Sequence, residues 1–244
     1  MMTIIFEQPL NEKIRSYLRL EYLAEQLQLH QDNDHLHQGF FPLFSLCELT
    51  ERCDYRSDVI KDIDKHLITM NQWRQLSHVD HDLVDSYVID LTHAREGLQA
   101  TERLGTQLKQ DRFLAALRQR FSMPGACCNF DLPQLHFWLA KPWAERQEQY
   151  RAWCQHFMPL LKPISIMLAL SRATSEFTPQ IAKQGFYQEQ SQLQLNLVRV
   201  RLSTELACYP TISGYRNRFA IHFVDFDSQK HTESDIPFEI AYCR

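Results

Sequence analysis

Cys127, Cys128 and His136 are the residues whose types and proximity suggest catalysis, because an imidazole can activate a thiolate nucleophile. Proximity along the chain is weak support, since catalytic partners meet in the fold. No recognised nucleophile signature surrounds the cysteines, and no Gly-x-Ser-x-Gly, P-loop or Gly-x-Gly-x-x-Gly motif occurs. Free cysteines usually pack as small hydrophobic side chains, so we expect packed thiols and no catalytic residue at these positions. An enzyme with a Cys/His centre stays open as an alternative.

The eleven histidines raise the question of a metal site. His30, His35 and His37 cluster in a polar segment, without a His-Glu-x-x-His motif or a zinc-finger spacing. Solvated loop histidines are the simpler interpretation. The sequence therefore predicts no metal ligand.

Three segments of the chain carry basic residues that lie close together. They are Arg15 and Arg19 on a predicted helix; Lys109, Arg112 and Arg120 on a later helix, with Arg118 off to the side; and Arg216 and Arg218 after a turn. Residues one helical turn apart, as in the first pair, share a face of the helix. If folding brings the three segments together, the chain gains one concentrated positive surface. Three separate solvated faces are the alternative, because runs of charge are usually solvated.

Apolar residues at helical spacing predict the elements that carry these arginines in the first half of the chain. The predicted helices span residues 12–30, 40–51, 57–76, 80–95 and 105–121. Asn11 is a suitable N-cap for the first of them. Short connections between helices favour antiparallel neighbours, so this half is expected to form a helical bundle.

The pattern changes after Pro124-Gly125, where residues 127–132 are expected to be extended or in a turn. A long helix follows over about 143–174, and its prolines should kink or divide it. Beyond Pro179, alternating apolar residues predict strands, with a bulge or register change near Leu197. The predicted strands cover 198–203, 219–223 and 236–242.

These elements together predict an α+β fold, with an N-terminal helical bundle domain and a C-terminal antiparallel β-rich domain. We expect the helical domain to span residues 10–122. The β-rich domain is expected to span 123–244, to contain the long helix, and to be joined by an N-terminal strand at 3–8.

The overall charge limits the class of partner. The formal net charge is −4 and the calculated pI is about 6.3, whereas proteins that coat nucleic acid are usually basic. A nucleic-acid-binding module that uses the same arginines stays open as a second alternative. Seven cysteines without a Cys-x-x-Cys pair, no signal peptide and no long apolar segment predict a cytoplasmic protein without membrane insertion.

Several blocks of residues, in order along the chain, form a recognisable pattern. The first block runs from Phe6 to Glu21, and the second from Asp111 to Trp138, including Pro124-Gly125-Ala126-Cys127-Cys128 and Phe130-Asp131-Leu132-Pro133. Further blocks are Gly185-Phe186-Tyr187-Gln188, Tyr209 to Gly214, and Arg218-Phe219-Ala220-Ile221. Together these blocks resemble the Z-ring-associated protein D (ZapD) family. The stretch from about 30 to 105 matches weakly.

The resemblance implies a cell-division factor rather than an enzyme. ZapD-like proteins are cytoplasmic homodimers with a helical and a β-rich domain, located at the division site at mid-cell. They bind the C-terminal tail of FtsZ, cross-link and bundle its protofilaments, and promote the assembly and stability of the Z-ring. No cofactor is implied.

The charged contact surface of the family transfers onto seven positions of this sequence. These partner-binding candidates are Arg15, Arg19, Arg112, Arg118, His136, Arg216 and Arg218. The resemblance also favours a structural turn over thiol chemistry at Cys127 and Cys128.

Overall fold

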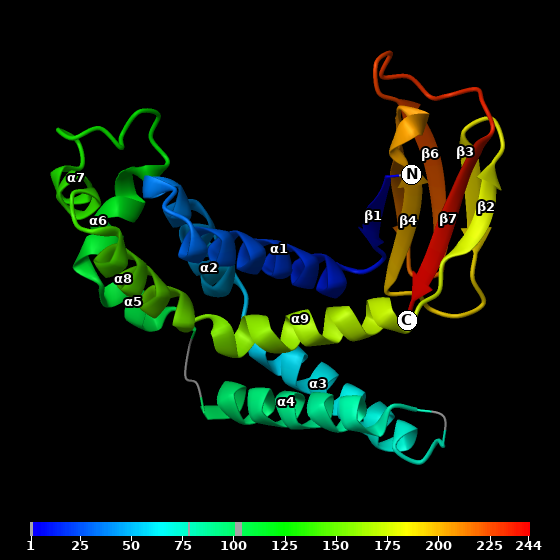
Figure 1. Cartoon of the computed structure of the whole chain (residues 1–244), viewed down its shortest axis with the longest axis horizontal. Helices are drawn as coiled ribbons and strands as arrows, with labels where there is room; N and C mark the ends of the chain where they lie inside the picture. Colours follow the sequence, from blue (N-terminus) through cyan, green and yellow to red (C-terminus); the bar gives the residue numbers. More distant parts are fainter. Residues whose placement is uncertain (1, 78, 101–103) are drawn as a thin grey trace. The chain divides into compact units, whose positions relative to one another are not determined.

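The computed structural model describes residues 2–77, 79–100 and 104–244. Helices dominate the first part of the chain and antiparallel strands the last part, which confirms the predicted α+β class (Figure 1). The chain forms two compact units. Unit 1 comprises Met1–Arg19 and Leu168–Arg244, and unit 2 comprises Leu20–Met167.

The helices of the described chain begin and end as follows: α1 (Glu12–Asp32), α2 (Phe40–Arg52), α3 (Arg56–Trp73), α4 (His81–Ala100), α5 (Thr106–Gln110), α6 (Arg112–Phe121), α7 (Pro133–Leu139), α8 (Trp143–Gln155) and α9 (Met158–Ala173). Helix α1 begins in unit 1 and α9 ends there. The predicted helix over 105–121 is divided, because Asp111 has an extended backbone and accepts hydrogen bonds from the N–H groups of Phe113 and Leu114. Asp111 therefore caps a new helix.

In the middle of the chain, the predicted turn at residues 127–132 and the predicted division of the helix at 143–174 are confirmed, whereas helix α7 was not predicted. Residues after Pro124 form turns and then helix α7, whose first residue is Pro133, a position where proline's missing N–H is tolerated. The predicted long helix at 143–174 is two helices that part at residues 156–157. Pro159 lies in the first turn of α9, where it costs no helical hydrogen bond, while Pro163 lies inside this helix.

Unit 2 is built around a cluster of aromatic rings. Phe40 of α2 lies with its ring centroid 5.3 Å from that of Trp138 in α7 and 5.9 Å from that of Trp153 in α8. Phe113 of α6 stacks on Trp153 at 5.8 Å. Residues 123–167, which we expected in the β-rich part, thus pack with the earlier helices. The predicted domains 10–122 and 123–244 stay predictions, since packing does not show independent folding.

Unit 1 contains two antiparallel sheets formed by these strands: β1 (Thr3–Pro9), β2 (Thr178–Ala182), β3 (Phe186–Gln190), β4 (Leu197–Ser203), β5 (Cys208–Tyr215), β6 (Arg218–Asp225) and β7 (Ile236–Cys243). In the part of the chain described, one sheet has the order β1-β4-β7-β2 and the other β3-β6-β5. The expected N-terminal strand is β1, which pairs with β4 along its whole length.

The two sheets pack face to face over one hydrophobic core. Val200 of β4, Ile240 of β7 and Phe223 of β6 are buried in it, as the alternation of apolar residues along each strand requires. The bulge expected near Leu197 is absent, because β4 begins at this residue and the residues before it form a loop. Leu195 of that loop is nevertheless buried in the core, which explains the apparent change of phase.

Candidate partner-binding surfaces

The first turns of α1 present Arg15 and Arg19 in unit 1. The Asn11 side-chain oxygen accepts a hydrogen bond from the Ile14 N–H at 2.9 Å, so the predicted N-cap is confirmed. Arg15 is half-buried and forms an ion pair with Glu12 at 3.2 Å. Arg19 is exposed and, among the described residues, has no ion pair. Of these two arginines, Arg15 is therefore already paired, whereas Arg19 has no ion pair within the described part of the chain.

Arg216 lies in the turn between β5 and β6, and Arg218 begins β6. The Arg216 backbone has φ 59°, and its N–H donates to the Leu10 carbonyl oxygen at 3.0 Å. This bond attaches the turn to the residue that precedes the α1 cap. Both arginine side chains are exposed and line an open pocket of about 860 Å³ on the β3-β6-β5 sheet. Folding therefore brings two of the three predicted segments into unit 1.

Arg112 is the first residue of α6 in unit 2. The neighbouring carboxylate of Asp111 caps the helix and also accepts a hydrogen bond from the indole N–H of Trp153 at 3.0 Å. Because these interactions hold the carboxylate in place, its role is to stabilise the start of α6 and its packing against α8. Arg112 is exposed, and in the described part of the chain it forms no ion pair or side-chain hydrogen bond.

His136 lies on α7, two residues before Trp138. The ring of Trp138 lies 5.9 Å from that of Phe113, so α7 packs beside the start of α6 that carries Arg112. His136 is exposed and has no ion-pair partner within residues 2–77, 79–100 and 104–244. The aromatic cluster of unit 2 therefore presents Arg112 and His136 on neighbouring helices.

Arg118 differs from the other candidates because a carboxylate of the same chain already holds it. Its guanidinium donates to both oxygens of Glu51, at 2.5 and 2.9 Å. This hydrogen bonding raises the pKa of Arg118 and lowers the pKa of Glu51. The predicted third segment thus lies in unit 2, where Arg118 is paired and Arg112 has no ion pair with any described residue.

A further cationic cluster on unit 1 was not singled out from the sequence. The Glu7 carboxylate binds Arg172 at 2.8 Å and Arg199 at 2.9 Å, and Arg201 lies 3.8 Å from the ring centroid of Phe177. The alternation of arginine with apolar residues in β4 is the sequence signal that places Arg199 and Arg201 on one face. Their partners come from distant segments, so only the fold reveals the cluster.

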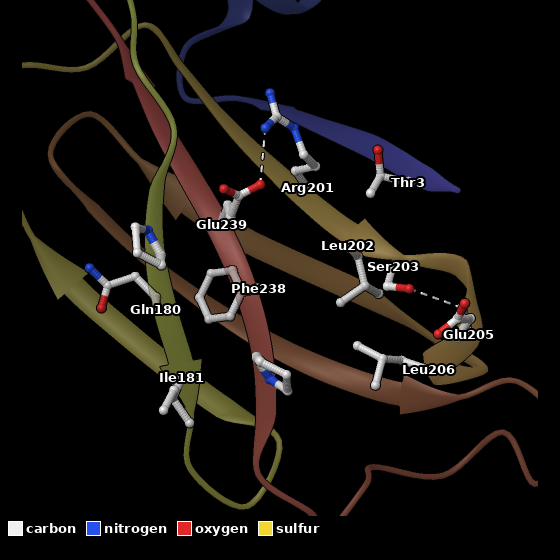
Figure 2. A pocket seen from close by; sticks show the side chains of 12 residues that line it. Thr3, Gln180, Ile181, Arg201, Leu202, Ser203, Glu205, Leu206, Phe238 and Glu239 are labelled. Carbon is white, nitrogen blue, oxygen red and sulfur yellow. Dashed lines mark hydrogen bonds and ion pairs between the residues drawn. The ribbon is translucent and has the colours of Figure 1, made fainter. Parts of the chain in front are cut away.

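An apolar cleft of about 570 Å³ lies beside this cluster. Figure 2 shows its lining, with the ion pair between Arg201 of β4 and Glu239 of β7 at 3.0 Å. Ile181 of β2 is 53% exposed there. The cleft has room for an apolar side chain, and its arginine is already paired.

The environments of Cys127 and Cys128 differ from that of an activated thiolate. The Cys128 thiol donates to Asp131 at 3.2 Å, and burial raises the pKa of the Cys127 thiol. An activated cysteine needs a lowered pKa instead. In the part of the chain that the structure describes, no group of three or more His, Cys, Asp or Glu side chains is placed to hold a metal ion. None of the helices described is long and apolar enough to span a membrane.

Comparison with known proteins shows the family. A family model described as "ZapD: Cell division protein" matches residues 18–222. The cell division protein ZapD of Shewanella baltica (strain OS185) is 60% identical over 243 residues and that of Vibrio cholerae (strain O395) is 39% identical over 246, each covering 100% of both chains. The chain therefore belongs to the ZapD family of cell division proteins.

Proposed function

We propose that this chain is a non-enzymatic adaptor of the division site, a cytoplasmic homodimer that binds the C-terminal tail of FtsZ and bundles FtsZ protofilaments. The family membership supports a role in cell division. The observation that carries the binding proposal is the presence, in both units, of exposed cations without an intramolecular ion pair among the described residues. Among these cations are Arg19 and Arg216 in unit 1 and Arg112 in unit 2, and the exposed His136 lies on the helix beside the start of α6.

Arginine suits this function because its guanidinium can pair bidentately with a carboxylate. Arg118 demonstrates this geometry with Glu51 inside the chain. A tail that is disordered before binding loses conformational entropy on docking, so a single site should bind modestly. The proposed tail contacts are the seven candidates: Arg15, Arg19, Arg112, Arg118, His136, Arg216 and Arg218.

A homodimer with two binding sites can cross-link filaments even when each single site binds with modest affinity. FtsZ filaments display many tails, so a dimer that holds one tail gains a high effective concentration of the next. Bundling therefore needs both the cationic residues and the dimer. A variant held monomeric should bind an isolated tail and fail to bundle filaments, and a monomer that bundled normally would contradict the bridging mechanism.

The double substitution Arg19→Glu with Arg112→Glu tests the proposal. Both side chains are exposed and unpaired among the described residues, so the variant should keep its stability and its dimer mass. Tail binding, measured by fluorescence anisotropy, and bundling, measured by sedimentation, should both be lost.

Lys61→Glu with Lys230→Glu is the matched control. It changes one exposed cation in each unit and gives the same net charge. This control should bind and bundle as the wild type does. Normal bundling by the folded arginine variant would overturn the proposal.

A further inference from the structure

A cleft in unit 2, formed by α2, α5 and α6, combines apolar and charged side chains. Its volume is about 480 Å³, and its apolar lining includes Phe44, Leu108, Leu114 and Ala115. Glu51, Lys109 and Arg118 line it as well. We name it the Glu51 cleft, after the carboxylate of α2 that binds cationic side chains of α5 and α6.

Glu51 forms ion pairs with both cations that line this cleft, Lys109 and Arg118. Both of its oxygens accept hydrogen bonds from Arg118, and one lies 3.6 Å from the Lys109 ammonium nitrogen. Glu51 is in the last turn of α2, Lys109 in α5 and Arg118 in α6. Glu51 therefore sits in this cleft as the carboxylate of a bound ligand would, although it belongs to the chain itself.

The charges leave the cleft suited to an anion. Two cations face one carboxylate, a net charge of plus one. Cys47, which also lines the cleft, adds no negative charge at neutral pH, because burial raises the pKa of its thiol to about 11. Glu48 interacts electrostatically with Arg118 and forms an ion pair with Arg52 on its own helix.

We propose that the Glu51 cleft docks an acidic peptide segment carrying an apolar side chain, and that Glu51 is an internal competitor which the peptide's carboxylate displaces from Arg118. The apolar side chain of the peptide would lie against Phe44 and Leu114, while its carboxylate takes the bidentate place on Arg118. This inference rests on the proposed function, since the FtsZ tail is the peptide in question, and it adds a regulatory contact to it.

Displacement is feasible because the internal pair is partly solvated. The Arg118 and Glu51 side chains are 36% and 25% exposed. Ion pairs of this kind contribute little, since both partners regain water when they separate. Removing the competitor should therefore tighten peptide binding by about five-fold, equivalent to about 1 kcal/mol.

The experiment measures the affinity of a fluorescein-labelled FtsZ C-terminal tail peptide for the full-length chain by anisotropy. Glu51→Gln should bind about five-fold more tightly than the wild type. Arg118→Gln should bind more weakly, and the double variant should lose the gain, because the gain acts through Arg118. Asp64→Asn is the control, since it removes one carboxylate from an ion pair with Arg95 at 2.7 Å outside the cleft. It should bind as the wild type does.

Each outcome distinguishes this inference from the proposed function. Wild-type binding with no gain in Glu51→Gln would overturn the internal competitor and leave the proposed function standing. A wild type that neither binds the tail nor bundles filaments would overturn both.

If Glu51→Gln does not fold, Ala115→Glu tests the same cleft. It adds a carboxylate to the lining without removing the Arg118 pair, so it should weaken tail binding several-fold. Unchanged binding by folded Ala115→Glu would exclude the cleft as the docking site.

Discussion

The backbone N–H of Arg216 donates to the carbonyl oxygen of Leu10 across 3.0 Å. Leu10 immediately precedes Asn11, the residue that caps α1. One hydrogen bond therefore joins the β5–β6 turn to the beginning of the helix that carries Arg15 and Arg19. These two segments are far apart in sequence, and the fold makes them neighbours within unit 1.

Gly214→Ala should destabilise unit 1 at this junction. A Cβ atom at Gly214 would lie 2.7 Å from Leu10 Cδ2 and 2.8 Å from the Arg218 carbonyl oxygen, and this backbone oxygen cannot move cheaply. We expect a loss of about 1–3 kcal/mol in the free energy of unfolding, measured with urea. Gly97→Ala is the control, because it lies in α4 with no atom within 4 Å of its added Cβ, and it should stabilise the chain by up to about 1 kcal/mol. Equal stability of Gly214→Ala and wild type would contradict this packing.

Asp34→Asn should destabilise unit 2. Arg146 is 5% exposed and donates to both oxygens of Asp34, and this hydrogen bonding lowers the pKa of Asp34. The substitution leaves a buried guanidinium without its carboxylate, so we expect a loss of about 2–3 kcal/mol at pH 7. Asp85→Asn breaks the exposed pair with Arg74 instead and should cost less than about 1 kcal/mol, by the same urea titration.

The ion pair between Asp34 and Arg146 also predicts how the free energy of unfolding depends on pH. Because the folded pKa of Asp34 lies below its ordinary value of 3.8, the stabilisation is complete above that pH and is lost as the pH falls through the folded pKa. Asp34→Asn should remove this part of the acid sensitivity, measured by urea unfolding from pH 5 downwards. A variant that retained the full wild-type slope would show that the pair contributes nothing to it.

Protonation of His30 should make unit 2 less stable in mild acid. Their Nδ1 atoms lie 2.8 Å apart, and burial of His30, followed by the nearby His35, lowers the pKa of His30 below 6.5. The unfolded chain then binds the proton more readily, so stability is complete above pH 6.5 and is lost as the pH falls through the folded pKa. His30→Ala removes the half-buried imidazole and should flatten the fall in unfolding free energy below that pH, and an unchanged fall in this variant would contradict the prediction.

Tail binding should weaken as salt is raised. Going from about 0.01 M to about 0.15 M ionic strength shortens the Debye length from about 30 Å to about 8 Å. If exposed arginines hold the tail, the dissociation constant measured by anisotropy should rise several-fold over this range. Circular dichroism at each salt concentration provides the control for folding. A constant affinity across the series would contradict an electrostatic contact.

The sequence alone was sufficient for the fold class and for much of the secondary structure. Helical spacing predicted α1 to α4 to within a few residues at most ends, and alternation predicted β4, β6 and β7, because both patterns follow from local backbone geometry. The Asn11 cap was predictable for the same reason. Helix α7 was missed, since its few apolar residues follow turns and are fixed by packing of Trp138 rather than by a local repeat.

The tertiary structure decided which of the candidate residues remain available. Arg112 and Arg118 lie on the same predicted helix, yet Glu51 of another helix binds Arg118 while Arg112 is exposed. In the same way, Arg216 lies beside Leu10 only because the β5–β6 turn packs there. Charges and periodicity are properties of single segments, whereas ion pairs and shared surfaces depend on which segments the hydrophobic core brings together.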